Sequence, residues 1–207
     1  MIWFCSDNGP EGSEDLSANR RHRGSTGGLR GRKRSLFNGG VGVPTLVKWP
    51  CVVVPGSEFS VPCSTLDYFP TIASRLGYRM PDNRPLDGID ILPILRSELR
   101  HMPVPIPYRF LDHKEFMFGS PTLALMNDEW KFLTNLSEDG SEDLLFNLAR
   151  DIKETTNVIA ENGDLAKDMR KHLADFIASC RKSHAGGDYS EPYEPVNRFQ
   201  EITGTWE

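Results

Sequence analysis

A regular spacing of apolar residues near the C-terminus sets the strongest constraint on the fold. Between residues 165 and 180, apolar side chains recur every three or four positions, which places them on one face of a long helix. These residues are Leu165, Met169, Leu173, Phe176, Ile177 and Cys180. The preceding segments 108–111, 122–126 and 130–133 are short, rich in β-forming residues and separated by turns. We therefore expect a small antiparallel sheet covered by this C-terminal helix.

The N-terminal half has a different pattern. Residues 1–5 form an apolar run without polar alternation, which is typical of a strand buried on both faces in a parallel sheet. The run has no basic leader and no cleavage pattern, so it does not read as a signal peptide. A second strand is expected at 45–49, and a helix is expected to begin at 64–67 and to end at Gly77, with Pro70 disturbing its course. The helix would carry an apolar face of Leu66, Phe69, Ile72, Ala73 and Leu76. The fold class is thus α/β.

Three regions follow from these patterns. Residues 1–98 form a unit with a mainly parallel sheet, 99–184 form a smaller α+β unit, and 185–207, rich in Gly, Pro and Glu, form a loosely held tail. Within the first unit, residues 9–31 are dominated by Gly, Ser, Asn and Arg and should form a long loop. Loops of that length usually serve a site.

Charge and cysteine content exclude several functions. The net charge of −5 argues against nucleic acid as the main partner, and no stretch is long and apolar enough for a membrane span. A basic run at 20–34 is either a solvated loop or a contact for a polyanion. The four cysteines lack the spacing of a zinc site, although Cys51 and Cys63 could close a small disulfide loop.

Asp7 and Asn8 are the first candidates for chemistry. A carboxylate and a carboxamide stand side by side at the end of an expected strand, and both offer the hard oxygen atoms that Ca²⁺ or Mg²⁺ prefers. An Asx turn that closes the strand is the commoner role of an Asp-Asn-Gly sequence. Two ligands also leave a calcium shell of about six or more oxygens incomplete.

Lys33 is the second candidate. It precedes a bend at 37–40 whose glycines let the backbone fold closely back on itself. An ammonium group there could neutralise a tetrahedral oxyanion as a compact point charge. Taken alone, a lysine in a basic loop is more often simply solvated.

The order of these pieces resembles the second half of the sulfatase family, within the alkaline-phosphatase-like superfamily. The resemblance is carried by SDNGP at 6–10, LRGRK at 29–33 and GGVGVP at 39–44. It continues through LDYFPTI at 66–72, RPLDGID at 84–90, EWKFL at 129–133 and DLLFNL at 143–148, and it ends near ETTN at 154–157. Several ordered segments with compatible spacing are more specific than any one of them.

This resemblance implies a fold, a reaction and site residues. The fold would be part of an alkaline-phosphatase-like sandwich, followed by the small sheet and helix. Asp7 and Asn8 would ligate a calcium ion, and Lys33 would act in catalysis by contacting a sulfate oxygen of the substrate. The substrate would be a sulfate ester, with sulfated carbohydrate as a family-level expectation. Members of the family are typically periplasmic, secreted or lysosomal.

The resemblance also shows what this chain lacks. The family's nucleophile is a formylglycine made within a Cys/Ser-x-Pro/Ala-x-Arg motif, and no cysteine here has that context. TIASR at 71–75 imitates the motif, but threonine is not the residue modified. Asn38 and Gly42 stand where the family usually has Glu and Arg, which would fit the loss of one ion pair. His22 and His113 are taken as surface residues.

Three hypotheses follow. The chain is the C-terminal portion of a sulfuric ester hydrolase that is inactive without an upstream nucleophile, or a non-catalytic module that binds sulfated glycan or another polyanion. The third possibility is a phosphoesterase or phosphonate hydrolase of the same superfamily, because the residue that would distinguish it lies outside this sequence.

Overall fold

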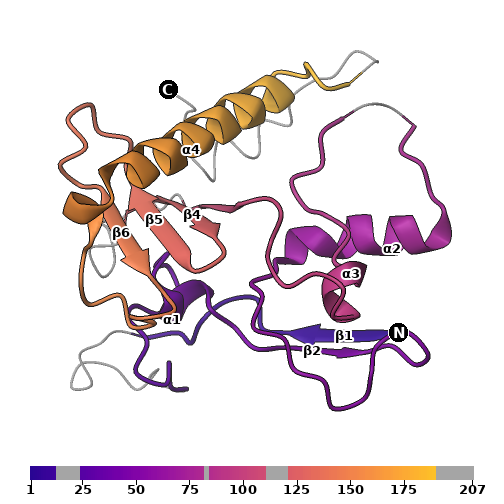
Figure 1. Ribbon diagram of the computed structural model, residues 1–207. Coiled ribbons are helices and arrows are strands. Elements are labelled where there is room, and N and C mark those ends of the chain that lie inside the picture. The colour runs from indigo at the N-terminus through magenta and orange to yellow at the C-terminus, as the bar shows by residue number, and fades with distance from the viewer. Residues whose placement is uncertain (13–23, 82–83, 111–120, 190–207) are drawn as a thin grey trace.

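Two antiparallel sheets organise the part of the chain that the structure describes. The computed structural model describes residues 1–12, 24–81, 84–110 and 121–189 (Figure 1). Strands β1 (Ile2–Cys5) and β2 (Thr45–Lys48) form a two-stranded sheet. A four-stranded sheet contains, in spatial order, β3 (Ile106–Arg109), β4 (Leu123–Asn127), β5 (Trp130–Thr134) and β6 (Leu144–Asn147). A short 3₁₀ turn, η3 (Ile159–Glu161), leads into the long helix α4 (Gly163–His184).

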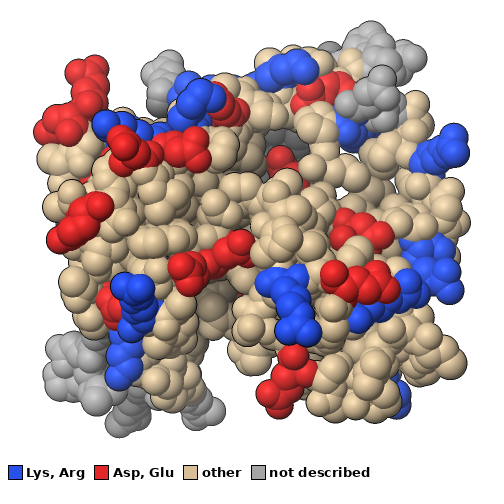
Figure 2. Space-filling view, viewed as in Figure 1, with Lys and Arg blue, Asp and Glu red and all other residues tan. Residues whose placement is uncertain are grey.

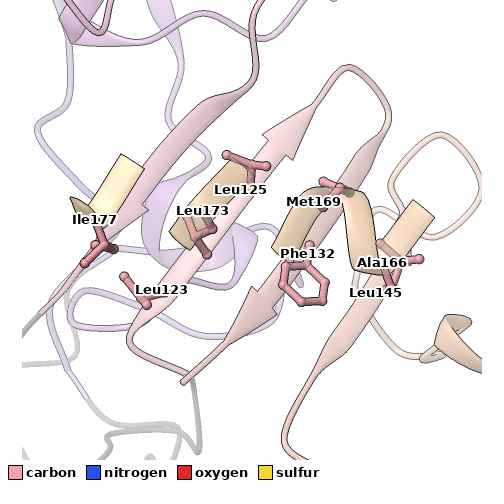
Figure 3. Packing of buried hydrophobic residues seen from close by; sticks show 8 residues of the cluster. All are labelled: Leu123, Leu125, Phe132, Leu145, Ala166, Met169, Leu173 and Ile177. Carbon is pink, nitrogen blue, oxygen red and sulfur yellow. The ribbon is translucent and has the colours of Figure 1, made fainter. Parts of the chain in front are cut away.

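Helix α4 covers one face of the four-stranded sheet, as the spacing of its apolar residues predicts. The strands alternate their side chains, so that Leu123, Leu125, Phe132 and Leu145 point toward α4 (Figure 3). On the helix, Ala166, Met169, Leu173 and Ile177 complete this core cluster. The β4–β5 hairpin turns at Asp128, whose φ of 49° is the left-handed conformation that such short turns need. The expected antiparallel sheet and covering helix are confirmed.

The opposite face of the same sheet is covered by the N-terminal half of the chain. Leu36 and Phe37 pack against Ala124, Leu133 and Phe146, the residues that alternate with those facing α4. Directly after Phe37 the backbone makes one helical turn, α1 (Asn38–Val41). The sheet therefore lies between α4 and the segment that leads out of the basic loop (Figure 1).

The second expected helix begins and ends where the sequence predicts. Ser64 and the side chain of Asp67 form a capping box around a 3₁₀ turn, η1 (Thr65–Asp67), which continues into α2 (Tyr68–Leu76). Gly77, with φ of 66°, ends the helix. Pro70 lies in the first turn of α2, where its missing N–H costs no helical hydrogen bond. A further single turn, α3 (Leu92–Leu95), follows.

The burial expected for residues 1–5 is not found. Within the described residues β1 pairs with β2 alone, and Trp3 on one face packs against Tyr68 at 4.0 Å between ring centroids. The other face is open, because Ile2, Phe4 and Leu46 are 62%, 66% and 68% exposed. An apolar run predicts a strand correctly but does not reveal how many layers cover it.

Several other expectations from the sequence can be compared with the described residues. The apolar face of α2 is also largely open, with Leu76 77% exposed. All four cysteines are free, so Cys51 and Cys63 form no disulfide. The described helices include none with both the length and the apolar character that a bilayer span requires. Residues 13–23, 111–120 and 190–207, which include His22, His113 and most of the expected tail, lie outside the described residues.

Candidate functional site

Asp7 and Asn8 are held at the end of β1 by a tight local turn. The Asn8 N–H donates to Asp7 Oδ1 at 3.0 Å, and the Ser6 hydroxyl donates to the Asn8 carbonyl at 2.8 Å. The next residue, Gly9, is buried and donates its N–H to the Gly40 carbonyl at 2.8 Å. This contact fastens the end of β1 to α1. An Asx turn, in which Asp7 would accept the N–H two residues on, is not formed, because Asp7 Oδ1 accepts the N–H of Asn8 and the Gly9 N–H bonds Gly40; the Asp7 side chain stays exposed.

A close approach of two backbones makes Gly9 necessary. A Cβ atom at Gly9 would lie 1.8 Å from the Gly39 carbonyl oxygen, and a Cβ atom at Gly39 would lie 2.1 Å from the Gly31 carbonyl oxygen. Glycine is the residue that allows such contact. The bend predicted from the glycines of this region is thus the place where three segments of the chain meet.

Lys33 reaches the same place from the other side of the loop. Its backbone N–H donates to the Pro10 carbonyl at 3.2 Å, two residues after Asn8. Its side chain is 40% exposed, and the ammonium Nζ lies 3.8 Å from Glu11 Oε2. The loop therefore brings together residues that are about 25 positions apart in the sequence.

The three predicted site residues line one depression of about 690 Å³. Its other walls come from the glycine-rich loop and from the stretch that enters β2. They are Ser6, Gly9, Pro10, Glu11, Ser25, Thr26, Gly27, Leu29, Gly39, Gly42, Val43 and Pro44. The lining therefore includes two carboxylates, from Asp7 and Glu11, one carboxamide, from Asn8, and one ammonium group, from Lys33.

Glu11 is a site residue that sequence reasoning missed. Its carboxylate contacts both Lys33 and Arg34, and the hydrogen bond from Arg34 holds the pKa of the Glu11 carboxyl below its usual value of 4.5. Nothing in a lone Glu between Pro and Gly signals this role. The contact shows that an anionic oxygen can approach the Lys33 ammonium from within the hollow.

The described part of the basic run is engaged within the protein. Arg30 stacks on Phe37 with its Cζ 3.7 Å from the ring centroid, and Arg32 donates to the Gly24 carbonyl at 2.9 Å. Arg34 bonds Glu11. Arg20, Arg21 and Arg23 lie outside the described residues. On the face seen in Figure 2, acidic and basic side chains are interspersed without a broad area of one sign.

The donor chemistry of Asp7 and Asn8 suits calcium, but their number does not complete a site. Both offer hard oxygen atoms at the rim of the hollow. Among the described residues, no group of three or more His, Cys, Asp or Glu side chains gathers in a way that could hold a metal ion. Further ligands would have to come from another segment or from water.

TIASR at 71–75 has a structural role. Thr71 is fully buried in α2, where its hydroxyl donates to the Asp67 carbonyl at 2.6 Å and accepts the Ile91 N–H at 3.1 Å. The hydroxyl thereby ties α2 to the segment entering α3. This agrees with the interpretation of the segment as helix core.

Comparison with known proteins gives one consistent result. The family model of the C-terminal region of N-sulphoglucosamine sulphohydrolase matches residues 31–182. Steryl-sulfatase of Rattus norvegicus is 32% identical over 209 aligned residues, which cover 84% of this chain and 35% of that protein. The crystal structure of Ps i-CgsB is similar with a TM-score of 0.64 and 33% identity, over 84% of this chain and 36% of that one. Its complex with k-i-k-neocarrahexaose gives a TM-score of 0.60 and 32% identity.

The chain spans about a third of the length of these relatives. The match nevertheless includes Lys33, α1, the four-stranded sheet and nearly all of α4. The structurally similar proteins have the alkaline-phosphatase-like architecture expected from the sequence. The chain belongs to the sulfatase family, and it corresponds to the C-terminal part of that family's proteins.

Proposed function

We propose that this chain supplies the calcium-ligating and sulfate-contacting residues of a sulfuric ester hydrolase. The observation that supports this most directly is the shared hollow. Asp7 and Asn8 follow β1, Lys33 comes from the far end of the loop, and all three line one depression. Because the chain belongs to the sulfatase family, we assign sulfatase roles to the three residues that meet in this hollow.

In this proposal each residue has a defined task. Asp7 and Asn8 would hold a calcium ion through their side-chain oxygens, and the bound ion would draw negative charge from the ester as the S–O bond breaks. Lys33 would contact a sulfate oxygen, in the place where the Glu11 carboxylate now approaches its ammonium group. The nucleophile would come from an upstream segment of sulfatase sequence, since the formylglycine motif does not occur in these 207 residues.

The proposed substrate is a sulfate ester, and sulfated carbohydrate is the class to test first. The similar protein Ps i-CgsB has been crystallised with k-i-k-neocarrahexaose.

We retain the proposed division of the chain at residue 98, although two of its apolar clusters draw residues from both sides of that point. The two units would then act as one body.

The polyanion-binding alternative is less favoured by the contacts. Arg30 is exposed, but its guanidinium stacks on Phe37. Arg32 and Arg34 are partly buried and bond the Gly24 carbonyl and Glu11. Salt-sensitive retention on a sulfated polysaccharide, without turnover, would support that alternative.

The test is hydrolysis of a chromogenic aryl sulfate, with and without calcium. It compares this chain with one extended through in-frame upstream sequence. We expect calcium-dependent activity in the extended form alone. There, Lys33→Ala should lower kcat/KM by about 10²–10³, the usual loss when one transition-state donor is removed. Lys48→Ala, an exposed lysine on β2, is the control. Activity of this chain by itself would refute the account of the nucleophile.

A further inference from the structure

A buried ion pair lies between the two halves of the chain. Lys131 of β5 and Glu154, in the turn after β6, are both completely buried, and Lys131 Nζ lies 2.8 Å from Glu154 Oε1. Lys131 also donates to Asn38 Oδ1 at 2.8 Å, and the Asn38 backbone N–H donates to Glu154 Oε2 at 2.6 Å. We call these three residues the buried triad. Each of the three residues thus contacts another segment of the chain, and Glu154 Oε1 meets Lys131 as an ion pair outside hydrogen-bond geometry.

The triad is connected to the hollow by an unbroken series of contacts. Asn38 begins α1, and the next residue, Gly39, donates its N–H to the Arg30 carbonyl at 2.7 Å. Gly40 accepts the N–H of Gly9, which directly follows the proposed calcium ligands. The Arg30 guanidinium donates in turn to the Glu154 backbone carbonyl at 2.9 Å. Glu154 is thus connected, through Asn38 and Arg30, both to the segment that carries Asp7 and Asn8 and to the loop that carries Lys33.

Burying the Lys131–Glu154 ion pair costs free energy, which suggests a role other than stabilising the fold. Two charges are removed from water, and an apolar pair of similar volume is often as stable as a buried ion pair. Glu154 also adopts a φ of 57°, which is unfavourable for a residue with a side chain. An apolar pair would fill the space, but it could not fix the orientation of the Asn38 amide. The charges and hydrogen bonds select one position of α1 against the sheet.

We propose that Lys131 and Glu154 are positioning residues of the site, which act through Asn38 to hold the Asp7–Asn8 wall and the Lys33 loop in register. This assignment rests on the proposed function for its meaning. Its geometry can be tested without turnover. The C-terminal sheet would then be part of the apparatus that builds the hollow, although none of its residues lines that hollow.

The test is amide hydrogen exchange, followed by NMR on the full chain. The reporters are the hydrogen-bonded N–H groups of Gly9, Lys33 and Gly39, three residues that line the hollow. Glu154→Gln leaves Lys131 without its carboxylate, and Lys131→Met combined with Glu154→Gln removes both charges and so avoids an uncompensated buried ion. We expect the reporters in the double variant to exchange at least about tenfold faster, while amides of α4 keep their rates.

A matched control separates positioning from general loosening. Asp143→Asn breaks the ion pair with Arg170, in which Nη1 lies 2.6 Å from Asp143 Oδ2, on the side of the sheet next to α4. There the reporters should change no more than the α4 amides do. The assignment would be overturned if the reporter amides of the double variant exchanged as slowly as in the unmodified chain. It would also be overturned if their exchange rates rose only as much as those of the α4 amides.

A titration with inorganic sulfate distinguishes failure of this inference from failure of the proposed function. We expect the Lys33 amide resonance of the unmodified chain to shift with sulfate, and the double variant to bind at least about tenfold more weakly. Absence of any shift in the unmodified chain would count against the sulfate contact of Lys33. The exchange rates would still decide whether the triad holds the loop.

Discussion

Replacing Gly9 by alanine should destabilise the protein more than its modest chemistry suggests. The added Cβ would lie 1.8 Å from the Gly39 carbonyl oxygen and 2.8 Å from the Gly39 carbonyl carbon, so backbone must move. Overpacking costs about 1–3 kcal/mol, and loss of the Gly9–Gly40 hydrogen bond adds about 0.5–1.5 kcal/mol. We expect the free energy of unfolding to fall by about 2–4 kcal/mol. For a chain of this size, that loss lowers Tm by roughly 5–15 °C.

The measurement is thermal and guanidinium unfolding followed by circular dichroism. Gly163→Ala is the matched control, because a Cβ there would meet nothing within 4 Å and Gly163 is the first residue of α4. Alanine should leave Tm unchanged or raise it slightly at that position, since it favours a helix. A Gly9→Ala variant that unfolds with the same midpoint as the unmodified chain would refute the close backbone approach on which the site's geometry rests.

Leu173→Ala should cost about 2–5 kcal/mol in chemical denaturation, because Leu173 is fully buried in the core under α4; Leu76→Ala, at an exposed position, should cost almost nothing. The Glu11 carboxyl should titrate below 4.5 in an NMR pH series. Its pKa is lowered in the fold, so its contact with Arg34 is complete above 4.5 and is lost as the pH falls through the lowered value; a midpoint at or above 4.5 would contradict this. Desolvation and then the charge of nearby Asp67 raise the pKa of the Cys63 thiol to about 11, so iodoacetamide at pH 8 should modify it roughly tenfold more slowly than an unperturbed thiol in a peptide. Peptide mapping by mass spectrometry measures that rate, and equal rates would exclude the shift.

The elements that sequence predicted best are those whose signal is local. The period of α4, the β4–β5 turn and the Gly77 stop each depend on a few neighbouring residues, and each is confirmed. Burial in the N-terminal half was predicted less well. The apolar run of β1 specifies a strand, but the number of layers around it depends on segments far away in sequence.

The candidate site divides in the same way. Convergence of Asp7, Asn8 and Lys33 on one hollow agrees with the residues singled out from motif order, whereas their chemical roles stay proposals. The buried triad was not foreseen, because Asn38 lies 93 positions from Lys131 and 116 from Glu154. A lysine in a strand looks like a surface residue, and only three-dimensional packing shows it to be fully enclosed.

The open face of β1 and β2 affects how this protein must be handled. Ile2, Phe4 and Leu46 form an exposed apolar surface on β1 and β2, beside strand edges that can pair with further strands. The native chain should therefore increase the fluorescence of dyes such as anilinonaphthalene sulfonate without any denaturant. Its colloidal stability should fall with concentration and improve with mild detergent. A purification tag fused to Met1 would lie next to this surface, and its choice would decide whether the protein stays in solution long enough to be assayed.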